Sequence, residues 1–145
     1  MAYLPGIGYA YRTKGKFSEG ATIIDLHRYT LTAAVPTKYS IQVGVDKHID
    51  GAGTRYLNHS CDPNVFVDAQ RLLVTTLRPL SRNEDLVFFY PANEWLMSVP
   101  FRCTCRSSQC IGTVAGASAT PLEILWRYRL NRHILKLIGT IHPER

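Results

Sequence analysis

The chain has 145 residues, of which 46% are apolar and 19% are charged, and its formal net charge is +6. This size fits one domain whose core needs no disulfides to hold it together. The sequence has no apolar run of the roughly 18 residues that a spanning helix requires, and its first residues lack the pattern of a signal peptide. We therefore expect an intracellular protein, in the cytoplasm or the nucleus, with no membrane partner.

The positive charge bears on the choice of partner. Basic side chains attract acidic molecules, including nucleic acid. In this chain they are dispersed, except near the C-terminus. Nucleic acid is therefore a possible partner that the charge by itself does not imply.

Most of the expected elements are short strands. Gly6-Ile7-Gly8 leads into the first, and further strands are expected at residues 22–26, 39–45, 64–67, 71–77 and 85–90. The strands at 64–67 and 71–77 should pair as a hairpin. In the last strand, the period of two puts Phe88 and Tyr90 on one face and Phe89 on the other.

One helix is expected near the C-terminus, at residues 121–138. Thr120 and Glu123 make a capping-box pattern, Pro121 suits a first helical turn, and Gly139 should end the helix. One face should pack against the domain through apolar side chains, namely Leu130, Ile134, Leu137 and Ile138. The opposite face should be solvated through basic side chains, namely Arg127, Arg132 and Lys136.

The stretch at residues 55–64 carries the most reactive side chains. Asn58 and His59 offer hydrogen-bond donors and acceptors beside the Cys61 thiol, a set that suits a buried polar ligand or a metal better than a core. Pro63 fixes its own φ and Asn64 can bond to the local backbone, so the chain should turn here. We expect the rest of the fold to be arranged around this central stretch.

The remaining cysteines lie close together, as Cys103, Cys105 and Cys110 in a Cys-x-Cys-x4-Cys run. Zinc takes four ligands in a tetrahedron, so three loop thiols need a fourth, and Cys61 is the one left. Two disulfides are the alternative, but a bridge between Cys103 and Cys105 would be strained and a cytosolic chain would not keep it. We expect one structural Zn²⁺ in a closed four-thiolate site.

These motifs, in this order and spacing, resemble the SET-domain protein lysine methyltransferases with a post-SET zinc module. The resemblance covers roughly residues 6–112. It implies a mainly β fold of several small sheets around a pseudoknot-like crossing, followed by the zinc loop and a C-terminal α-helix. The expected boundaries are residues 1–100 for the SET domain, 101–114 for the post-SET loop and 115–145 for a helical extension.

The resemblance also implies the roles of the site residues. The cofactor would be S-adenosylmethionine, with the methyl-transfer centre at Tyr90. Phe88, on the same face, would belong to the substrate channel and influence how many methyl groups are added. The positions that match cofactor contacts are Gly6, Ile7, Gly8, Tyr39, Arg55, Asn58 and His59.

The expected activity is transfer of a methyl group to the ε-amine of a lysine in a partner protein, histone or not. Two alternatives stay open. One is an inactive SET-like binding or regulatory module, because residues 26–29 differ from the Tyr-x-Gly-Glu-like segment usual in that family. The other is a SET-like catalyst acting on a small molecule, because the sequence offers no separate recognition domain. The target, the number of methyl groups and the oligomeric state are not readable from the sequence.

Overall fold

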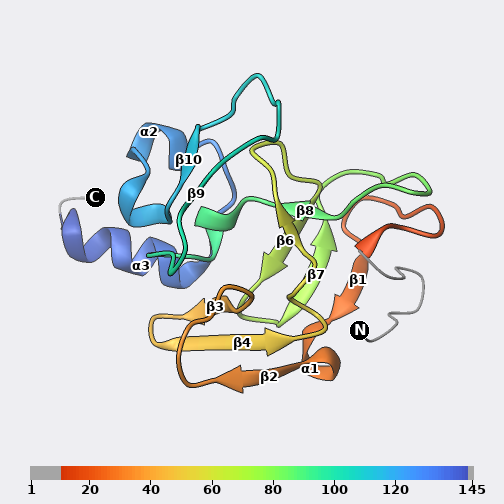
Figure 1. Cartoon of the computed structure of the whole chain (residues 1–145), viewed down its shortest axis with the longest axis horizontal. Coiled ribbons are helices and arrows are strands. Elements are labelled where there is room, and N and C mark those ends of the chain that lie inside the picture. Colours follow the sequence, from red (N-terminus) through yellow and green to blue (C-terminus); the bar gives the residue numbers. More distant parts are fainter. Residues whose placement is uncertain (1–10, 144–145) are drawn as a thin grey trace.

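The computed structural model describes residues 11–143, so the expected cofactor loop at Gly6, Ile7 and Gly8 lies outside the described residues. Within the described part, ten short strands form four small sheets (Figure 1). The strands are β1 Thr22–Asp25, β2 Thr30–Ala33, β3 Ile41–Gly44, β4 Lys47–Gly51, β5 Asn58–His59, β6 Val65–Asp68, β7 Leu73–Thr76, β8 Val87–Phe88, β9 Phe101–Arg102 and β10 Thr113–Val114. The α-helices are α1 Leu26–Tyr29, α2 Leu122–Leu125 and α3 Arg132–Ile141.

The four sheets have simple topologies. Two are three-stranded and antiparallel, with strand orders β1-β7-β6 and β2-β4-β3. The strands β9 and β10 form an antiparallel pair, whereas β5 and β8 pair in parallel. This mainly β arrangement of small sheets with a C-terminal helix confirms the expected fold class. None of the helices between residues 11 and 143 combines the length and the apolarity needed to cross a bilayer.

The expected hairpin is confirmed as β6 and β7, which pair antiparallel from Val65 opposite Thr76 to Asp68 opposite Leu73. All four residues of β6 are buried, so this strand serves two cores. Val67 packs in the core that also contains Val74, whereas Phe66 packs in the core of the C-terminal helices. The alternation of side chains along a strand thus joins the helical extension to the β domain.

The strand expected at residues 85–90 is shorter than predicted. β8 contains only Val87 and Phe88, and Tyr90 begins a 3-10 helix over Tyr90–Ala92 because Pro91 cannot donate to a strand ladder. The predicted alternation nevertheless holds. The rings of Phe88 and Tyr90 lie 4.7 Å apart, while Phe89 points the other way and stacks on Tyr128 at 3.6 Å.

The prediction of a single helix at residues 121–138 is wrong. It is split into α2 and α3, with Asn131 between them in extended conformation at φ −71° and ψ 156°, and α3 continues past Gly139 to Ile141. The Asn131 side chain bonds to backbone far away in the sequence, which holds the chain out of the helix. The apolar face is placed as predicted, since Ile134 and Ile138 are buried.

The expected capping box is also wrong. The Thr120 hydroxyl donates to the Gly116 carbonyl at 2.8 Å, and the N-cap residue of α2 is Pro121, which makes no side-chain cap hydrogen bond. Gly116 has φ +108°, and a Cβ at this position would lie 2.5 Å from the Trp95 carbonyl oxygen. The turn before α2 is therefore set by a close backbone approach that only glycine permits.

The central stretch is bound directly to β8. β5 pairs with β8 in parallel, with Asn58 opposite Val87 and His59 opposite Phe88. Asn64 adds two bonds beyond the strand, because its amide donates to the Asp85 carbonyl at 2.8 Å and accepts from the Val87 N–H at 2.9 Å. The turn predicted at this asparagine therefore places the central stretch beside Phe88 and Tyr90.

Candidate active site

A pocket of about 370 Å³ brings together the site residues expected within the described part of the chain. They come from three separate segments: the loop before β3, the central stretch, and β8 with the residues after it. The residues are Tyr39, Arg55, Asn58, His59, Phe88 and Tyr90. The volume falls in the range of small-ligand pockets.

Tyr90 is held in this pocket by its own hydroxyl, which donates to the Leu57 carbonyl at 2.8 Å. Burial and, to a smaller extent, the negative charge of Glu94 together raise the pKa of Tyr90 to about 12. The phenol therefore stays protonated at neutral pH. It can supply a hydrogen bond and a fixed wall, but it is not a base at that pH.

His59 connects Tyr90 to the cysteine cluster. Its Nδ1 accepts the Tyr90 backbone N–H at 3.1 Å, so the neutral ring carries its proton on Nε2, which lies 3.3 Å from Cys61 Sγ and can donate to it. Burial lowers the pKa of His59 to about 4, which keeps the ring neutral. One imidazole thus spans the pocket wall and the thiol site.

Aromatic rings enclose the pocket around Tyr90. Besides Phe88, the ring of Phe101 lies 5.9 Å from both the His59 and the Tyr90 rings, in edge-on contact. Our sequence reasoning did not assign Phe101 to the site, although its place just before Cys103 was a usable signal. Apolar walls of this kind disfavour a charged amine and lower its pKa.

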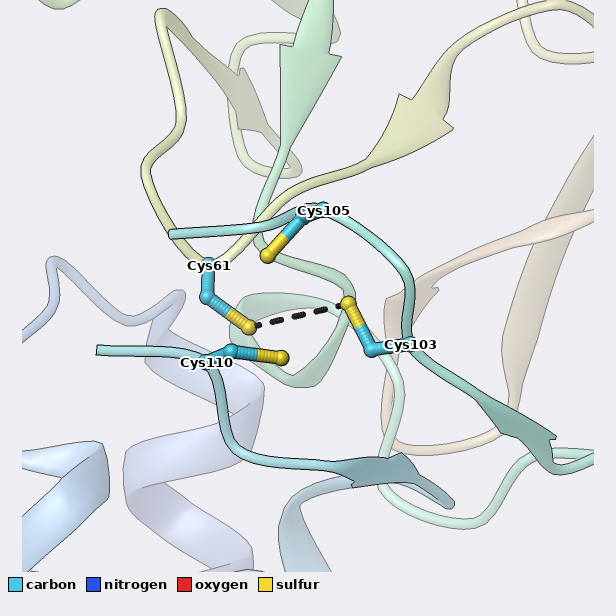
Figure 2. Close-up of side chains that lie close together, drawn as sticks. All are labelled: Cys61, Cys103, Cys105 and Cys110. Carbon is cyan, nitrogen blue, oxygen red and sulfur yellow. Dashed lines mark hydrogen bonds between the residues drawn. The ribbon is translucent and has the colours of Figure 1, made fainter. Parts of the chain in front are cut away.

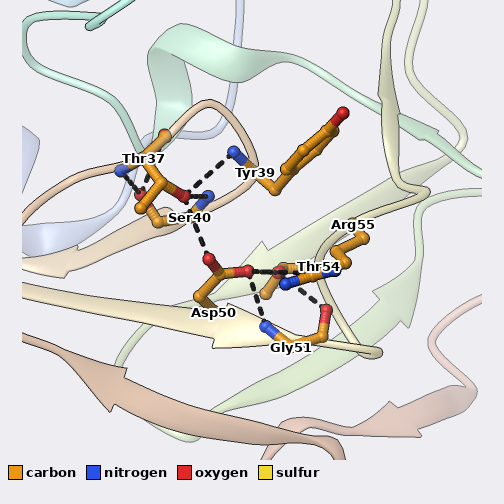
Figure 3. A network of polar contacts seen from close by, with 7 residues as sticks. All are labelled: Thr37, Tyr39, Ser40, Asp50, Gly51, Thr54 and Arg55. Atoms are coloured by element: carbon orange, nitrogen blue, oxygen red, sulfur yellow. Dashed lines mark hydrogen bonds and ion pairs between the residues drawn. The ribbon is translucent and has the colours of Figure 1, made fainter.

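Asp50 connects the two segments of the site that carry Tyr39 and Arg55 (Figure 3). Its carboxylate accepts the Thr37 hydroxyl at 3.0 Å and the Gly51 N–H at 2.7 Å, and it lies 3.7 Å from the Arg55 guanidinium. Thr37 in turn accepts the Tyr39 N–H at 3.2 Å. Asp50 therefore positions the two segments that carry Tyr39 and Arg55, a role that sequence reasoning missed.

Glu94 is a further pocket residue that sequence reasoning missed. Its Oε1 accepts the Gln42 backbone N–H at 2.8 Å. Burial raises the pKa of Glu94 to about 7, and the bond from Gln42 lowers it only in part. No motif surrounds this residue in the sequence, because its neighbours Asn93 and Trp95 are not part of any recognised pattern.

The four cysteines converge on one point (Figure 2). Their sulfur atoms all lie within 4.8 Å of one another, with Cys61 and Cys103 at 3.9 Å, and all four are free thiols rather than disulfides. Sulfurs bound about 2.3 Å from a central zinc lie about 3.8 Å apart in a tetrahedron. The donor set and its spacing fit a metal site that takes a thiophilic divalent ion.

Hydrogen bonds also connect Cys61 to the loop between β9 and β10 and to the C-terminal region. Its carbonyl accepts the Gln109 amide at 3.0 Å and the Tyr128 hydroxyl at 2.7 Å, and its sulfur accepts the Ile111 N–H at 3.3 Å. Burial raises the pKa of the Cys61 thiol, so a nearby cation is needed to favour its thiolate. The loop between β9 and β10 thus lies against the central stretch, next to the pocket.

Residues 8–91 match the model of the family described as the SET domain. The chain belongs to the SET-domain methyltransferase family. The four clustered thiols, three of which follow the matched region, are consistent with a post-SET zinc site. The family membership predicted from the motifs is thereby confirmed.

Two curated SET-domain relatives differ in how much of them this chain covers. Methyltransferase flvH of Aspergillus flavus is 38% identical over 125 residues, which span 79% of this chain and 70% of that protein. The H3 lysine-36 specific histone-lysine N-methyltransferase of Candida albicans is 32% identical over 98 residues, which span 60% of this chain and 11% of that protein. The chain thus corresponds to only a small part of the histone enzyme.

Solved structures show the same SET fold. The crystal structure of KRYPTONITE in complex with mCHG DNA and SAH has a TM-score of 0.55 and 21% identity, covering 77% of this chain and 27% of that one. The methyltransferase domain of human SETMAR has a TM-score of 0.51 and 16% identity, covering 79% of this chain and 56% of that one. At these identities the likeness concerns the fold.

Proposed function

We propose that this SET domain transfers a methyl group from S-adenosylmethionine to the ε-amine of a protein lysine. One observation carries the proposal: Tyr90 shares a single pocket with Arg55, Asn58 and His59, the positions that match cofactor contacts in the family. A methyl donor and an acceptor amine could therefore meet beside a protonated phenol.

The pocket residues suit the cofactor chemically. S-adenosylmethionine carries a carboxylate, an ammonium, a sulfonium and an adenine ring, and it supplies the electrophilic methyl group. Arg55 offers a guanidinium to the carboxylate, Asn58 offers amide hydrogen bonds, and Tyr39 offers an aromatic face. Gly6, Ile7 and Gly8 would complete this contact from outside the described residues.

The aromatic lining around Tyr90 supports an amine as the methyl acceptor. Phe88, Tyr90 and Phe101 would surround an incoming amine with aromatic walls that favour its neutral, nucleophilic form. Holding the amine in line with the methyl donor supplies much of the rate enhancement in such a displacement. Relatives named as histone-lysine N-methyltransferases support lysine as the acceptor.

We also propose that the four cysteines bind one structural Zn²⁺. Four thiolates leave no open coordination position, so the metal would take no part in the chemistry. Its role would be to hold the loop between β9 and β10 against Cys61, which keeps Phe101 at the pocket. His59, which lines the pocket and contacts Cys61, would therefore lie between the zinc and the cofactor.

The test is transfer of labelled methyl groups from S-adenosylmethionine to lysine-peptide arrays that include histone tails. A parallel arm contains small primary amines. Tyr90→Phe should bind S-adenosylmethionine within about threefold of the wild-type affinity but lose transfer by a factor of about 100, because removing a positioned donor typically costs that much. Tyr29→Phe, outside the pocket, is the matched control and should stay active.

Each other result has a defined meaning. Cofactor binding without transfer to any acceptor would replace the proposal with the inactive binding module. Transfer to small amines and to no peptide would replace the protein lysine with a small-molecule substrate. Full activity of Tyr90→Phe would remove Tyr90 from the transfer centre.

A further inference from the structure

Glu94 places a carboxyl group inside the pocket, one turn after Tyr90. Its backbone N–H donates to the Tyr90 carbonyl at 2.9 Å, and its side chain reaches β3, where Oε1 accepts the Gln42 N–H at 2.8 Å. Among residues 11–143, no other acidic side chain lines this pocket. Glu94 is thus the source of negative charge at this wall.

The carboxyl group of Glu94 is partly buried and has few partners within the protein. A carboxylate offers about four acceptor positions, yet one backbone N–H accounts for the bonding of Glu94 within the described chain. No ion pair involving Glu94 occurs among residues 11–143, and the nearby Arg55 is paired with Asp50. The remaining acceptor positions of this carboxylate can therefore take a charge-assisted hydrogen bond from a cationic ligand in the pocket.

We propose that Glu94 binds the ammonium group of the amine substrate and accepts a proton from it before methyl transfer. This inference rests on the proposed function, and it identifies the group that accepts the proton of the amine in that reaction. The ammonium R–NH₃⁺ and the carboxylate become R–NH₂ and a neutral carboxyl group. The amine lone pair then forms the N–C bond while the S–C bond of the methyl donor breaks, and that electron pair stays on sulfur.

Two other titratable groups at the pocket are neutral near pH 7. Burial lowers the pKa of His59 to about 4 and raises that of Tyr90 to about 12. Neither of them changes charge between pH 6 and pH 8. The basic side chains that line the pocket are those of Lys38 and Arg55.

For two histidines on neighbouring elements, burial disfavours the charged form. His48 on β4 lies opposite Gln42 in the sheet, and His133 on α3 bonds to the carbonyl of Asn93 at 2.7 Å. Burial lowers the pKa of both imidazoles. Glu94, with a pKa raised to about 7 by burial, is therefore the group that titrates.

The direction of the pH effect follows from the charge of Glu94. Below pH 7 the carboxyl group is protonated, so it neither attracts an ammonium nor accepts a proton. Above pH 7 the carboxylate does both. Amine binding should therefore strengthen between pH 6 and pH 8, and methyl transfer should rise over the same range.

Binding of n-butylamine, a mimic of the lysine side chain, tests this without turnover. The titration uses the complex of the full chain with S-adenosylhomocysteine. Wild-type protein should bind butylammonium at least about tenfold more tightly at pH 8 than Glu94→Gln does, as expected for loss of a charge-assisted hydrogen bond. Glu94→Gln can still accept the Gln42 N–H, and Glu123→Gln at an exposed carboxylate is the matched control.

The pH profile of transfer tests the proton step. With the best acceptor from the peptide and amine arrays, wild-type kcat/KM should rise with an apparent pKa near 7. In Glu94→Gln the rise should move toward the amine's own pKa of about 10, with activity regained at high pH. A structural defect alone would lower the rate without moving the profile.

The outcomes separate the two proposals. Equal butylammonium affinity, or an unmoved pH profile, in Glu94→Gln would overturn the role of Glu94 while leaving methyl transfer intact. Weaker binding of S-adenosylmethionine or S-adenosylhomocysteine by Glu94→Gln, with butylammonium binding unchanged, would assign the carboxylate to the cofactor's cation instead. Failure of the wild-type protein to bind the cofactor would overturn the proposed function itself.

Discussion

Phe88 shows how a single side chain can decide the outcome of the proposed reaction. Its ring lies 4.7 Å from that of Tyr90, and it is almost fully buried while still lining the pocket. A phenylalanine leaves this wall without a hydroxyl, so in the proposed reaction an amine that already carries a methyl group would have room to turn and react again. We therefore expect Phe88 to influence the number of transfers through volume rather than through charge.

We predict that Phe88→Tyr shifts the products toward the monomethylated amine. The added hydroxyl, with any water that it orders, takes up the space that a second methyl group needs. Mass spectrometry of the product after exhaustive reaction measures the ratio, and Phe17→Tyr, outside the pocket, controls for adding a hydroxyl. Unchanged product ratios would remove Phe88 from the acceptor channel.

At the scale of elements, Asn131 joins the C-terminal helices to the β domain. Its side chain donates to the carbonyls of Val67 at 3.0 Å and Ala92 at 2.9 Å, and accepts the Ala69 N–H at 2.9 Å. The same residue precedes α3. One amide therefore connects β6, the 3-10 helix after Tyr90, and the last helix.

Asn131→Ala should destabilise the protein by about 3 kcal/mol, because it leaves the buried Ala69 N–H without its partner and removes one hydrogen bond from each of the Val67 and Ala92 carbonyls. Urea unfolding followed by circular dichroism measures the free energy of unfolding. Arg132→Ala, an exposed neighbour, should change it by less than about 0.5 kcal/mol. Similar values for the two variants would contradict the connecting role of Asn131.

At the scale of the whole molecule, the thiol cluster joins the central stretch to the loop between β9 and β10. Cys61 also bonds to Tyr128 in the C-terminal region, so three parts of the chain meet at one residue. His59 carries the connection onward to the backbone of Tyr90. The stability of the fold and the shape of the pocket should therefore depend on the same metal.

Removing the metal with a chelator should lower the Tm by on the order of 10 °C or more, since structural zinc contributes several kcal/mol to folding. Metal analysis of the purified protein should find one zinc per chain, and added zinc should restore the Tm. Cys110→Ser should lower the Tm in the same way and respond less to the chelator. An unchanged Tm after complete metal removal would contradict a structural site.

The sequence by itself determined the features that depend on local spacing. Three thiols within eight residues predicted the cluster, the period of two set the faces of Phe88, Phe89 and Tyr90, and Pro63 with Asn64 predicted the bend after the central stretch. These predictions succeed because the local backbone geometry of a strand or short loop restricts the directions of neighbouring side chains.

Only the tertiary structure decided the features that depend on distant partners. Asn131 breaks the predicted helix because the carbonyls of Val67 and Ala92 lie beside it in space. Glu94 enters the pocket because a backbone N–H of β3, at Gln42, lies within reach of its carboxylate. Burial and charge at such positions depend on segments far away in the chain, and residue spacing carries no record of which segments will meet.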